Sequence, residues 1–205
     1  MYIPKFFKVH DIEKVKDFIQ KNSFGILINQ VDGKPWATHI PLVLETKNAN
    51  ESILFGHIAK ANKQWQAFQE GHEVLVIFQG PHAYISSSWY DHENVPTWNY
   101  AAVHVYGKIR IVDNNTLYEH LSKLVDKYET GNENPVQVSA MSANMLEKQM
   151  SAIVGFEIQI TEIQAAEKLS QNRDEKNYSN IIAELEKNGD RDSMEIAEAM
   201  KKLKR

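Results

Sequence analysis

The sequence predicts a mostly β protein with a few helices, arranged as a largely antiparallel barrel and followed by a C-terminal helical arm. Short runs of apolar and β-branched residues recur along residues 1–163, and glycine-containing turn signals separate them, as in small all-β barrels. Few segments of this region show helical periodicity. Residues 164–205 have the composition of a polar loop followed by helix. We therefore expect a barrel domain over 1–163 and an arm over 164–205.

A helix begins after Asp11, a residue type that caps helices, and places Ile12, Val15, Phe18 and Ile19 on one face. Residues 24–31 and 35–44 form a hairpin around Asp32-Gly33, a strong hairpin signal. Further strands are expected at 53–58, 73–79, 83–87, 101–112 and 153–163. Helices are expected at about 62–70 and 116–128, the second burying Leu117, Leu121, Leu124 and Tyr128 and ending at Gly131.

Composition excludes several classes of protein. The chain has 205 residues and no cysteine, which excludes disulfides, thiolate catalysis and cysteine-ligated metal sites. Its net charge of −4 gives no overall electrostatic reason to bind nucleic acid. No apolar run approaches the length of a membrane span, and the start lacks the apolar region of a signal peptide. We therefore expect a cytoplasmic protein.

The most informative stretch is residues 80–107, which concentrates tyrosine, tryptophan and histidine around a run of three serines. A segment built only for a core would use aliphatic residues, because buried hydroxyls, imidazoles and indole N–H groups each need a partner. Flat aromatic faces beside hydroxyls suit a planar ligand with polar edges. An aromatic loop that packs against a neighbour or a dimer mate is the alternative.

A second segment, FGHIAKANKQW at 55–65, carries the elements of an anion site. A strand runs into a helix start with Asn62 as the cap and with Lys60 and Lys63 beside it. Free N–H groups and the positive end of a helix dipole favour an anion, most naturally a phosphate. The alternative is an ordinary capped helix with two solvated lysines. A nucleotide-like cofactor, planar at one end and phosphorylated at the other, would use both segments.

These residues carry a resemblance to a known family. The relevant segments are MYIPKFF at the start, ATHIPLVLE at 37–45, FGHIAKANKQW, GPHAYISSSWY, VPTWNYAAVHVYGKI at 95–109, and KLSQNR at 168–173. The chain resembles the split-barrel FMN-binding superfamily, with its pyridoxamine-phosphate-oxidase-like fold. Within it the chain resembles the PaiB-type FMN-binding negative regulators of transcription, which control protease production and sporulation. The resemblance implies a split β-barrel, FMN as cofactor and a homodimer.

The resemblance also implies roles for residues in the first half of the chain. Lys60, with Asn62 and the helix-start amides, would hold the FMN phosphate, and it stands where an arginine is expected more often. Thr38, His39 and Ile40 would lie along the ring or the ribityl chain. His57, in the same matched segment as Lys60, is a further cofactor-binding candidate.

In the second half, the resemblance assigns the other wall of the pocket to Tyr84, Ile85, Ser86 and Ser87. Trp98 and Asn99 would lie where a second subunit completes the pocket. The tail would close the site through Lys168, Gln171 and Arg173.

The sequence contains no motif for metal binding or for hydrolase chemistry. The eight histidines include no HExxH or comparable pair, so a structural role is favoured over metal binding. No G-x-S-x-G elbow accompanies the serines, which leaves hydrolase chemistry unsupported.

The tail has the outline of a helix–turn–helix. Ile181, Ile182 and Leu185 share one face of a helix at 178–187 that Ser179 would cap. After Asn188-Gly189-Asp190, Asp192 and Glu195 form a capping-box-like start for a helix at 193–204. Basic residues of this helix cluster only at its end, at Lys201, Lys202, Lys204 and Arg205. Because a recognition helix meets DNA with its start, we favour a packing or dimer-stabilising arm over a DNA reader.

Three functions remain open at this point. The favoured one is an FMN-binding homodimer with a regulatory role, in which direct DNA contact is implied by the resemblance but not supported by charge. The others are an FMN-dependent oxidoreductase, of the flavin-reductase or haem-degrading type, and a cofactor-free dimeric binding protein. No side chain stands out as an acid or base beyond the histidines, so an enzyme is the less favoured interpretation.

Overall fold

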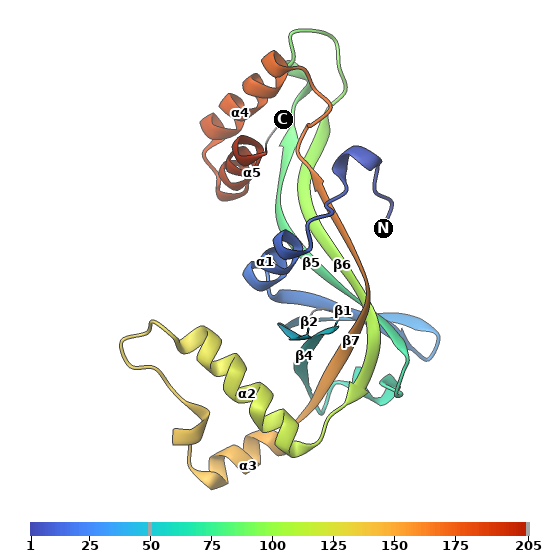
Figure 1. The fold of residues 1–205 in the computed structure, drawn as a ribbon, viewed down its shortest axis with the longest axis vertical. Coiled ribbons are helices and arrows are strands. Elements are labelled where there is room, and N and C mark those ends of the chain that lie inside the picture. The colour runs from blue at the N-terminus through green and yellow to red at the C-terminus, as the bar shows by residue number, and fades with distance from the viewer. Residues whose placement is uncertain (49–50, 204–205) are drawn as a thin grey trace. The chain divides into compact units, whose positions relative to one another are not determined.

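The computed structural model describes residues 1–48 and 51–203, and the chain forms two compact units. The arm unit comprises Met1–Asn22, Phe78–His104 and Gln164–Arg205, and the sheet unit comprises Ser23–Ile77 and Val105–Ile163. Three long strands contribute to both units: β5 (Glu73–Ile85), β6 (Thr97–Ile111) and β7 (Ile153–Lys168) (Figure 1). The division of the chain into a domain over 1–163 and an arm over 164–205 stays a prediction.

The described residues form a seven-stranded sheet in the order β2-β1-β5-β6-β7-β4-β3. The remaining strands are β1 (Phe24–Val31), β2 (Lys34–Pro41), β3 (Val43–Asn48) and β4 (Glu51–Ala59). β1 pairs antiparallel with β2 and β5, and β4 pairs antiparallel with β3 and β7. The predicted mostly β, largely antiparallel fold is confirmed.

The first hairpin forms as predicted. Asp32 and Gly33 join β1 to β2, and Val31 pairs with Lys34 across the turn. Both turn residues have positive φ, 51° at Asp32 and 75° at Gly33. A two-residue turn of this kind matches the twist of the flanking strands.

Two strand boundaries differ from the prediction. The segment predicted as one strand at 35–44 breaks at Leu42, whose backbone N–H donates to the carbonyl of Ser23 (2.8 Å), and β3 begins after it. Conversely, the strands predicted at 73–79 and 83–87 are one strand, β5, that continues through Gly80. A Cβ at Gly80 would lie 2.6 Å from the ring of Phe18, so this glycine permits a close approach and does not make a turn. β6 begins earlier than predicted and β7 ends later.

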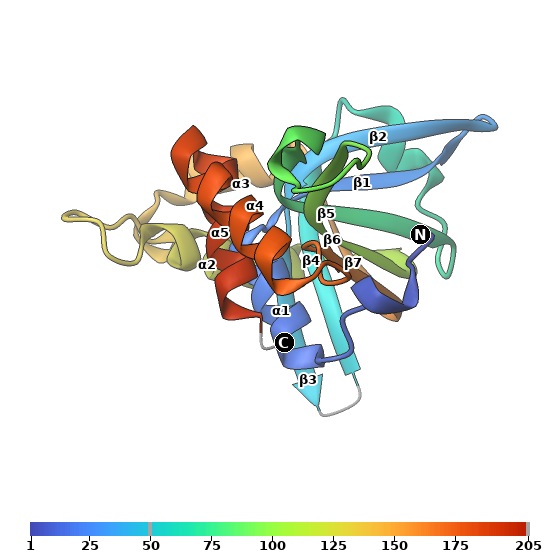
Figure 2. The same ribbon diagram turned by 90° about the horizontal axis from the view of Figure 1, so that it is seen from above.

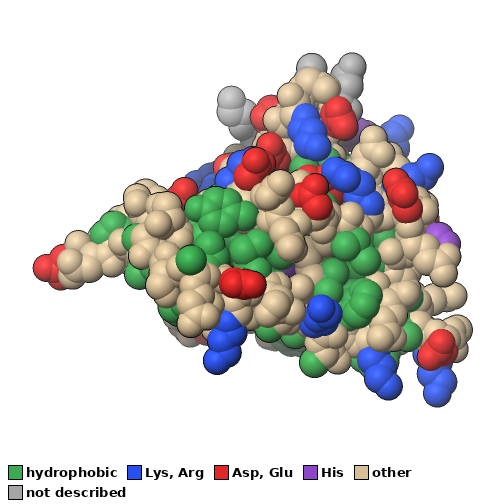
Figure 3. Space-filling model, turned by 90° about the horizontal axis from the view of Figure 1, so that it is seen from below, with side chains coloured by type: hydrophobic (Ala, Val, Ile, Leu, Met, Phe, Trp, Pro, Cys, Tyr) green, Lys and Arg blue, Asp and Glu red, His purple; other side chains and the backbone are tan. Residues whose placement is uncertain are grey.

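The sheet unit also carries two α-helices and two short 3₁₀ helices. α2 (Asn114–Glu129) follows the cap Asp113, and α3 (Ala143–Ser151), which the sequence did not predict, follows the cap Ser142. The 3₁₀ helices are η2 (Lys63–Ala67) and η4 (Val138–Ala140). Of the residues expected to be buried on α2, Leu117 is buried, Leu121 and Leu124 are partly exposed, and Tyr128 is half exposed. Hydrophobic side chains gather on the face that Figure 3 shows.

A buried polar contact anchors α2 to the sheet. His120 lies on Phe55 of β4, with ring centroids 4.0 Å apart and planes inclined by 15°. His120 Nε2 is 3.2 Å from Glu157 Oε1, and Arg110 bonds the other carboxylate oxygen. Burial lowers the pKa of His120, so the imidazole is neutral and donates from Nε2 at neutral pH.

The arm unit contains α1 (Ile12–Lys21), α4 (Glu175–Asn188) and α5 (Arg191–Lys202), with 3₁₀ helices η1 (Lys5–Phe7) and η3 (Ser87–Trp89). Asp11 caps α1 as predicted, accepting from the N–H groups of Glu13 and Lys14. On its apolar face Val15 and Ile19 are buried, whereas Ile12 is half exposed.

The helix pair of the tail forms as predicted, but its caps were assigned wrongly. Asp174 caps α4 and Asp190 caps α5, each accepting from the N–H group three residues later, in place of Ser179 and Asp192. Gly189, with φ of 69°, turns the chain so that α4 and α5 lie side by side (Figures 1 and 2). Lys204 and Arg205 lie outside the described residues. No helix among the described residues has the length and apolar character needed to cross a membrane.

The two tail helices share a core with the strand end and turn before them. This cluster is built from buried side chains of β5, the residue after η3, the loop after β7, α4 and α5: Ala83, Ile85, Tyr90, Leu169, Tyr178, Ile181, Leu185, Ile196, Ala197 and Met200. The contacts support the interpretation of the tail as a packing arm.

Candidate functional site

The fifteen candidate residues fall into two groups, one in each unit. The sheet unit holds Thr38, His39, Ile40, His57, Lys60 and Asn62. The arm unit holds Tyr84, Ile85, Ser86, Ser87, Trp98, Asn99, Lys168, Gln171 and Arg173.

In the sheet unit, Thr38 and Asn62 belong to a polar network centred on Gln64. Thr38 Oγ1 donates to Gln64 Oε1 (2.5 Å) and accepts from Asn62 Nδ2 (3.0 Å). Gln64 is fully buried, and its Nε2 donates to Asn29 Oδ1 (2.8 Å) and to the carbonyl of Leu27 (3.2 Å). The sequence did not point to Gln64, because a glutamine at the start of a helix is normally a surface residue.

The expected phosphate site at the helix start takes another form. The helix predicted over 62–70 is a five-residue 3₁₀ helix, so it lacks the aligned peptide dipoles of a longer α-helix. Asn62 caps it as predicted, but its Oδ1 already accepts from Gln64 N. The Lys60 side chain is exposed, while its backbone N–H donates to Ala152 and its carbonyl accepts from Trp65 Nε1. The Lys60 ammonium is thus solvated, and it lies beside a turn whose polar groups already form hydrogen bonds within the protein.

The other three sheet-unit candidates differ in exposure. The His39 ring is exposed and stacks on Phe24 with centroids 6.3 Å apart. Ile40 is buried. His57 is partly buried, and burial lowers its pKa, which keeps the imidazole neutral at pH 7.

In the arm unit, Tyr84 and Trp98 form an exposed aromatic pair across β5 and β6. Their ring centroids are 5.8 Å apart at an angle of 69°, an edge-to-face contact. The ring centroid of His82 is also 6.0 Å from that of Trp98. Tyr84 is 47% exposed and Trp98 is 52% exposed, so both rings present apolar area to solvent.

Shortly after Tyr84 in the chain, Ser86 caps η3 and Ser87 begins it. Ser86 Oγ accepts from Ser88 N (3.2 Å) and lies 2.9 Å from Ser88 Oγ, which fixes the turn. Ile85, just before them, is fully buried in the core of the tail helices. The serine hydroxyls are therefore held on a turn whose anchor is buried.

Lys168 and Arg173 lie at the two ends of the turn between β7 and α4. Lys168 Nζ donates to Thr97 Oγ1, and the Arg173 guanidinium lies 5.0 Å from the centroid of the Tyr90 ring. Partial burial, with a smaller contribution from Arg173, lowers the pKa of Lys168. The Lys168 ammonium thus lies in a partly buried setting that disfavours its charged form.

The same turn is fixed by Gln171 and Asn99. Gln171 Oε1 accepts from Leu169 N (2.7 Å), and its Nε2 donates to the carbonyl of Glu167 (2.5 Å). Asn99 is fully buried, and its amide both donates to Ser170 Oγ (3.0 Å) and accepts from it (3.1 Å). Asn99 Nδ2 also lies 3.6 Å from Met200 Sδ of α5, so the contacts observed for Asn99 are with the turn that carries Lys168 and with α5, and a direct contact with the cofactor stays a prediction.

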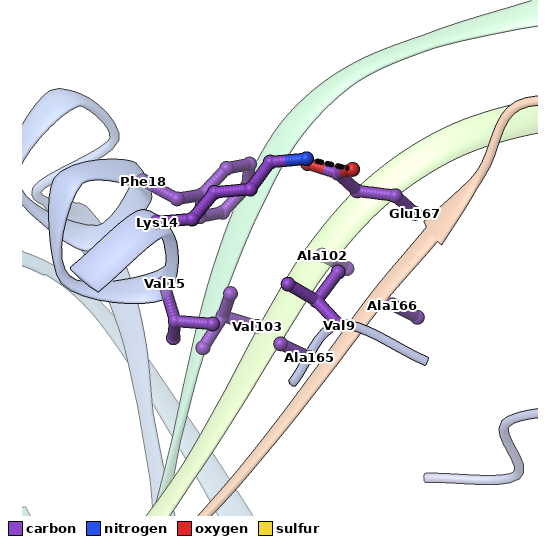
Figure 4. Close-up of a pocket in the computed structure, with 9 residues that line it drawn as sticks. All are labelled: Val9, Lys14, Val15, Phe18, Ala102, Val103, Ala165, Ala166 and Glu167. Atoms are coloured by element: carbon purple, nitrogen blue, oxygen red, sulfur yellow. Dashed lines mark hydrogen bonds and ion pairs between the residues drawn. The ribbon is translucent and has the colours of Figure 1, made fainter. Parts of the chain in front are cut away.

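The hollows bring few of the candidate residues together: an open cleft of about 540 Å³ in the arm unit is lined by one of them, Gln171, beside His10, Lys14 and Glu167. The pocket in Figure 4 has a volume of about 10 Å³, lies between α1 and the strands beside it, and is crossed by the Lys14–Glu167 ion pair. That volume is too small for an organic ligand. An open cleft of about 570 Å³ in the sheet unit is lined by Asn29, His72, Glu73 and Tyr106 among others, none of them a candidate. Among the described residues, no cluster of histidine, aspartate and glutamate could hold a metal ion.

Comparison with known proteins places the chain in a family. Residues 1–162 match the family model described as "Putative FMN-binding domain". The chain is 48% identical over 206 residues to protease synthase and sporulation protein PAI 2 of Bacillus subtilis (strain 168), covering 100% of this chain and 99% of that one.

Two solved structures share the fold at low identity. The FAD and heme binding protein of Mycobacterium smegmatis has a TM-score of 0.61 and 15% identity, covering 86% of this chain and 79% of that one. The flavocytochrome Anf3 of Azotobacter vinelandii has a TM-score of 0.63 and 16% identity, covering 87% and 78%.

Proposed function

Because the chain belongs to the FMN-binding domain family, with a split-barrel fold, we propose that it is an FMN-binding regulator of the PaiB type. In this proposal it acts in the cytoplasm as a homodimer, and residues among the fifteen candidates bind FMN. FMN supplies a planar ring, a polyhydroxyl chain and a terminal phosphate, and the candidate residues include groups suited to each. Ile85 and Asn99 support the site from buried positions.

The observation that carries the proposal is the exposed aromatic pair of the arm unit. Trp98 and Tyr84 expose about half of their surface, which is unusual for large aromatic side chains that lie next to each other. Serine hydroxyls on a fixed turn follow Tyr84 in the chain. A flat indole face with hydroxyl groups nearby suits a planar ring with polar edges.

Strand alternation in β6 supports the homodimer. Successive side chains of a strand point to opposite faces, and along β6 the exposed Trp98 is followed by the buried Asn99. Thr97, which bonds Lys168, therefore lies on the face opposite to Trp98. A ligand that contacts both the aromatic pair and the Lys168 side of the strand needs one of them from a second copy of the chain. Light scattering should give twice the chain mass of 23.6 kDa, and a monomer mass at micromolar concentration would refute the dimer.

The exposed cations of α5 give no support for a DNA-reading surface. Arg191 pairs with Glu195 (2.8 Å), and Lys202 pairs with Glu198 (3.5 Å). Lys201 bonds Glu186 of α4. Since non-specific DNA affinity scales with the phosphates that cations neutralise, we propose that regulation acts through the ligand, a partner or a specific site.

Titration of FMN into Trp98 variants tests the proposal. Trp98→Ala should weaken FMN binding by about 1–2 kcal/mol, the scale of one aromatic stacking contact, whereas Trp98→Phe should retain most of the affinity. Tyr2→Ala, which removes an aromatic ring that is 88% exposed, is the matched control and should bind FMN normally. Equal dissociation constants for Trp98→Ala and the parent protein would remove the aromatic pair from the site.

A further inference from the structure

A polar cleft of about 270 Å³ opens in the sheet unit, between residues of β3, β4, β6 and β7 and the turn before β5. None of the fifteen candidate residues lines it. The buried side chains of Ile53 and Ile109 give its wall an apolar part. Charged side chains of both signs line the rest: Lys47, Lys108, Arg110, Glu51, Glu70 and Glu157. Because sites for drug-sized ligands measure about 300–1,000 Å³, this cleft suits a smaller molecule.

The Arg110 guanidinium is held at one point and keeps other donors free. It bonds Oε2 of Glu157, whose side chain is buried and whose Oε1 lies 3.2 Å from His120 Nε2. Among the described residues no other acceptor bonds the Arg110 side chain, which is 52% exposed. A guanidinium carries five N–H donors and can bind a carboxylate through two parallel hydrogen bonds. The cleft therefore presents an oriented guanidinium with N–H groups left for a ligand.

Two opposite charges on the same cleft have no partner in the protein. Lys108 precedes Arg110 by two residues on β6, so both side chains leave the strand on the same face. Within the part of the chain that the structure describes, the Lys108 ammonium forms no hydrogen bond or ion pair, and neither does the Glu70 carboxylate. Since Lys108 and Glu70 line one cleft without pairing with each other, a ligand that carries both signs of charge can contact both.

The other two carboxylates of the cleft already have partners. Glu157 bonds Arg110, and Lys47 Nζ lies 3.9 Å from the same carboxylate. Glu51 accepts from Asn48 Nδ2 (3.1 Å). Three cations and three carboxylates leave the cleft without net charge. Such a cleft gives no advantage to a phosphate or a polyanion, whereas separated charges of both signs complement a zwitterion.

We propose that this cleft binds a small zwitterion of the α-amino-acid class. The ligand carboxylate contacts Arg110 and Lys108, its ammonium group contacts Glu70, and its side chain lies against Ile53 and Ile109. The site shares no residue with the flavin candidates, so the proposal does not rest on the proposed function. Affinity in about the millimolar range is expected, because a few charge-assisted hydrogen bonds must offset the cost of association.

The first experiment titrates L-leucine into the ¹⁵N-labelled full-length chain, without flavin and at constant ionic strength, and follows the amide resonances of Gly71, Lys108 and Arg110. These resonances should shift saturably. L-leucinamide lacks the carboxylate and N-acetyl-L-leucine lacks the ammonium group, so each should bind at least about tenfold more weakly, the scale of one charge-assisted hydrogen bond. The proposal is overturned if neither L-leucine nor L-alanine gives a saturable shift, or if either analogue binds as well as L-leucine.

The second experiment repeats the L-leucine titration with variants of the cleft. Arg110→Lys keeps the charge but loses the planar fork, and it should weaken binding about five- to tenfold. Lys108→Gln and Glu70→Gln should each weaken binding about three- to tenfold, less than a buried pair would, because both side chains are exposed. Lys34→Gln, which removes an exposed charge of β2 outside the cleft, is the matched control and should bind normally. Unchanged affinity in Arg110→Lys and Glu70→Gln, or an equal loss in Lys34→Gln, would show that the cleft does not hold the ligand.

Discussion

Replacing Asn99 by alanine tests whether the contact between β6 and the tail turn holds the arm unit together. The Asn99 amide is fully buried and exchanges two hydrogen bonds with the Ser170 hydroxyl, at 3.0 and 3.1 Å. Ser170 is itself only 4% exposed and has the positive φ that the turn requires. Asn99→Ala removes both bonds and leaves the Ser170 hydroxyl buried without its partner.

The expected cost follows from these contacts. A net hydrogen bond contributes about 0.5–1.5 kcal/mol, and a buried polar group left without a partner costs about 1–3 kcal/mol. Because one bond in each direction shares the same hydroxyl, the two effects overlap and do not simply add. We expect Asn99→Ala to lower the free energy of unfolding by about 2–4 kcal/mol.

Urea unfolding of a double-mutant cycle with Ser170→Ala measures the contact. Each single variant should be destabilised, and the double variant should be more stable than the sum of the two losses predicts, because both remove the same interaction. Asn172→Ala, an exposed asparagine in the same turn, is the control and should change stability by less than about 0.5 kcal/mol. Additive losses, or a loss at Asn99 no larger than that of the control, would refute the reasoning.

Four further outcomes are expected. Glu157→Gln should lower the free energy of unfolding by about 1–3 kcal/mol, measured by urea unfolding. The loss should lie towards the lower end of this range, because Arg110 is half exposed and can be hydrated when it loses the carboxylate. An unchanged unfolding midpoint would contradict the anchoring role of the Glu157 carboxylate. Burial lowers the pKa of His120, so below about pH 6.5 the unfolded chain binds more protons than the folded chain does. The free energy of unfolding should therefore fall as the pH is lowered from 7 to 5. In His120→Gln this dependence on pH should be weaker. Ile181→Ala should cost about 2–4 kcal/mol, and the partly buried Ile182→Ala less; equal losses would argue against the described face of α4. Gel-shift titration at about 150 mM salt should show no binding to random-sequence duplex DNA tighter than about 10 µM. Submicromolar binding that weakens steeply as salt is added would instead indicate that the tail helices bind DNA.

Sequence patterns correctly predicted the turns and helix caps whose geometry depends only on neighbouring residues. Asp32-Gly33 made its hairpin because its two positive φ angles belong to the turn itself, and Asp11 capped its helix through the next N–H groups. The break at Leu42 and the unbroken course of β5 through Gly80 could not be predicted in this way. The first depends on a hydrogen bond to Ser23, and the second on the ring of Phe18. Both partners are distant in the sequence.

The candidate site shows the same limit. The sequence identified Trp98 and Lys168 through residue type and family resemblance. It could not show that Asn99 is buried against Ser170, because that contact joins residues 71 positions apart. Gln64 was missed for the same reason: its burial arises from contacts with Thr38 and with β1, and no local pattern distinguishes it from a surface glutamine.

The central claim is that this chain binds FMN. The most direct test is the visible absorption spectrum of the purified full-length protein, recorded after incubation with FMN and removal of the free ligand. The account predicts a flavin spectrum that stays with the protein and is released on denaturation, as the family membership and the aromatic and cationic groups of the arm unit imply. A folded protein that remains colourless after this treatment, and that leaves the fluorescence of added FMN unchanged, would contradict it.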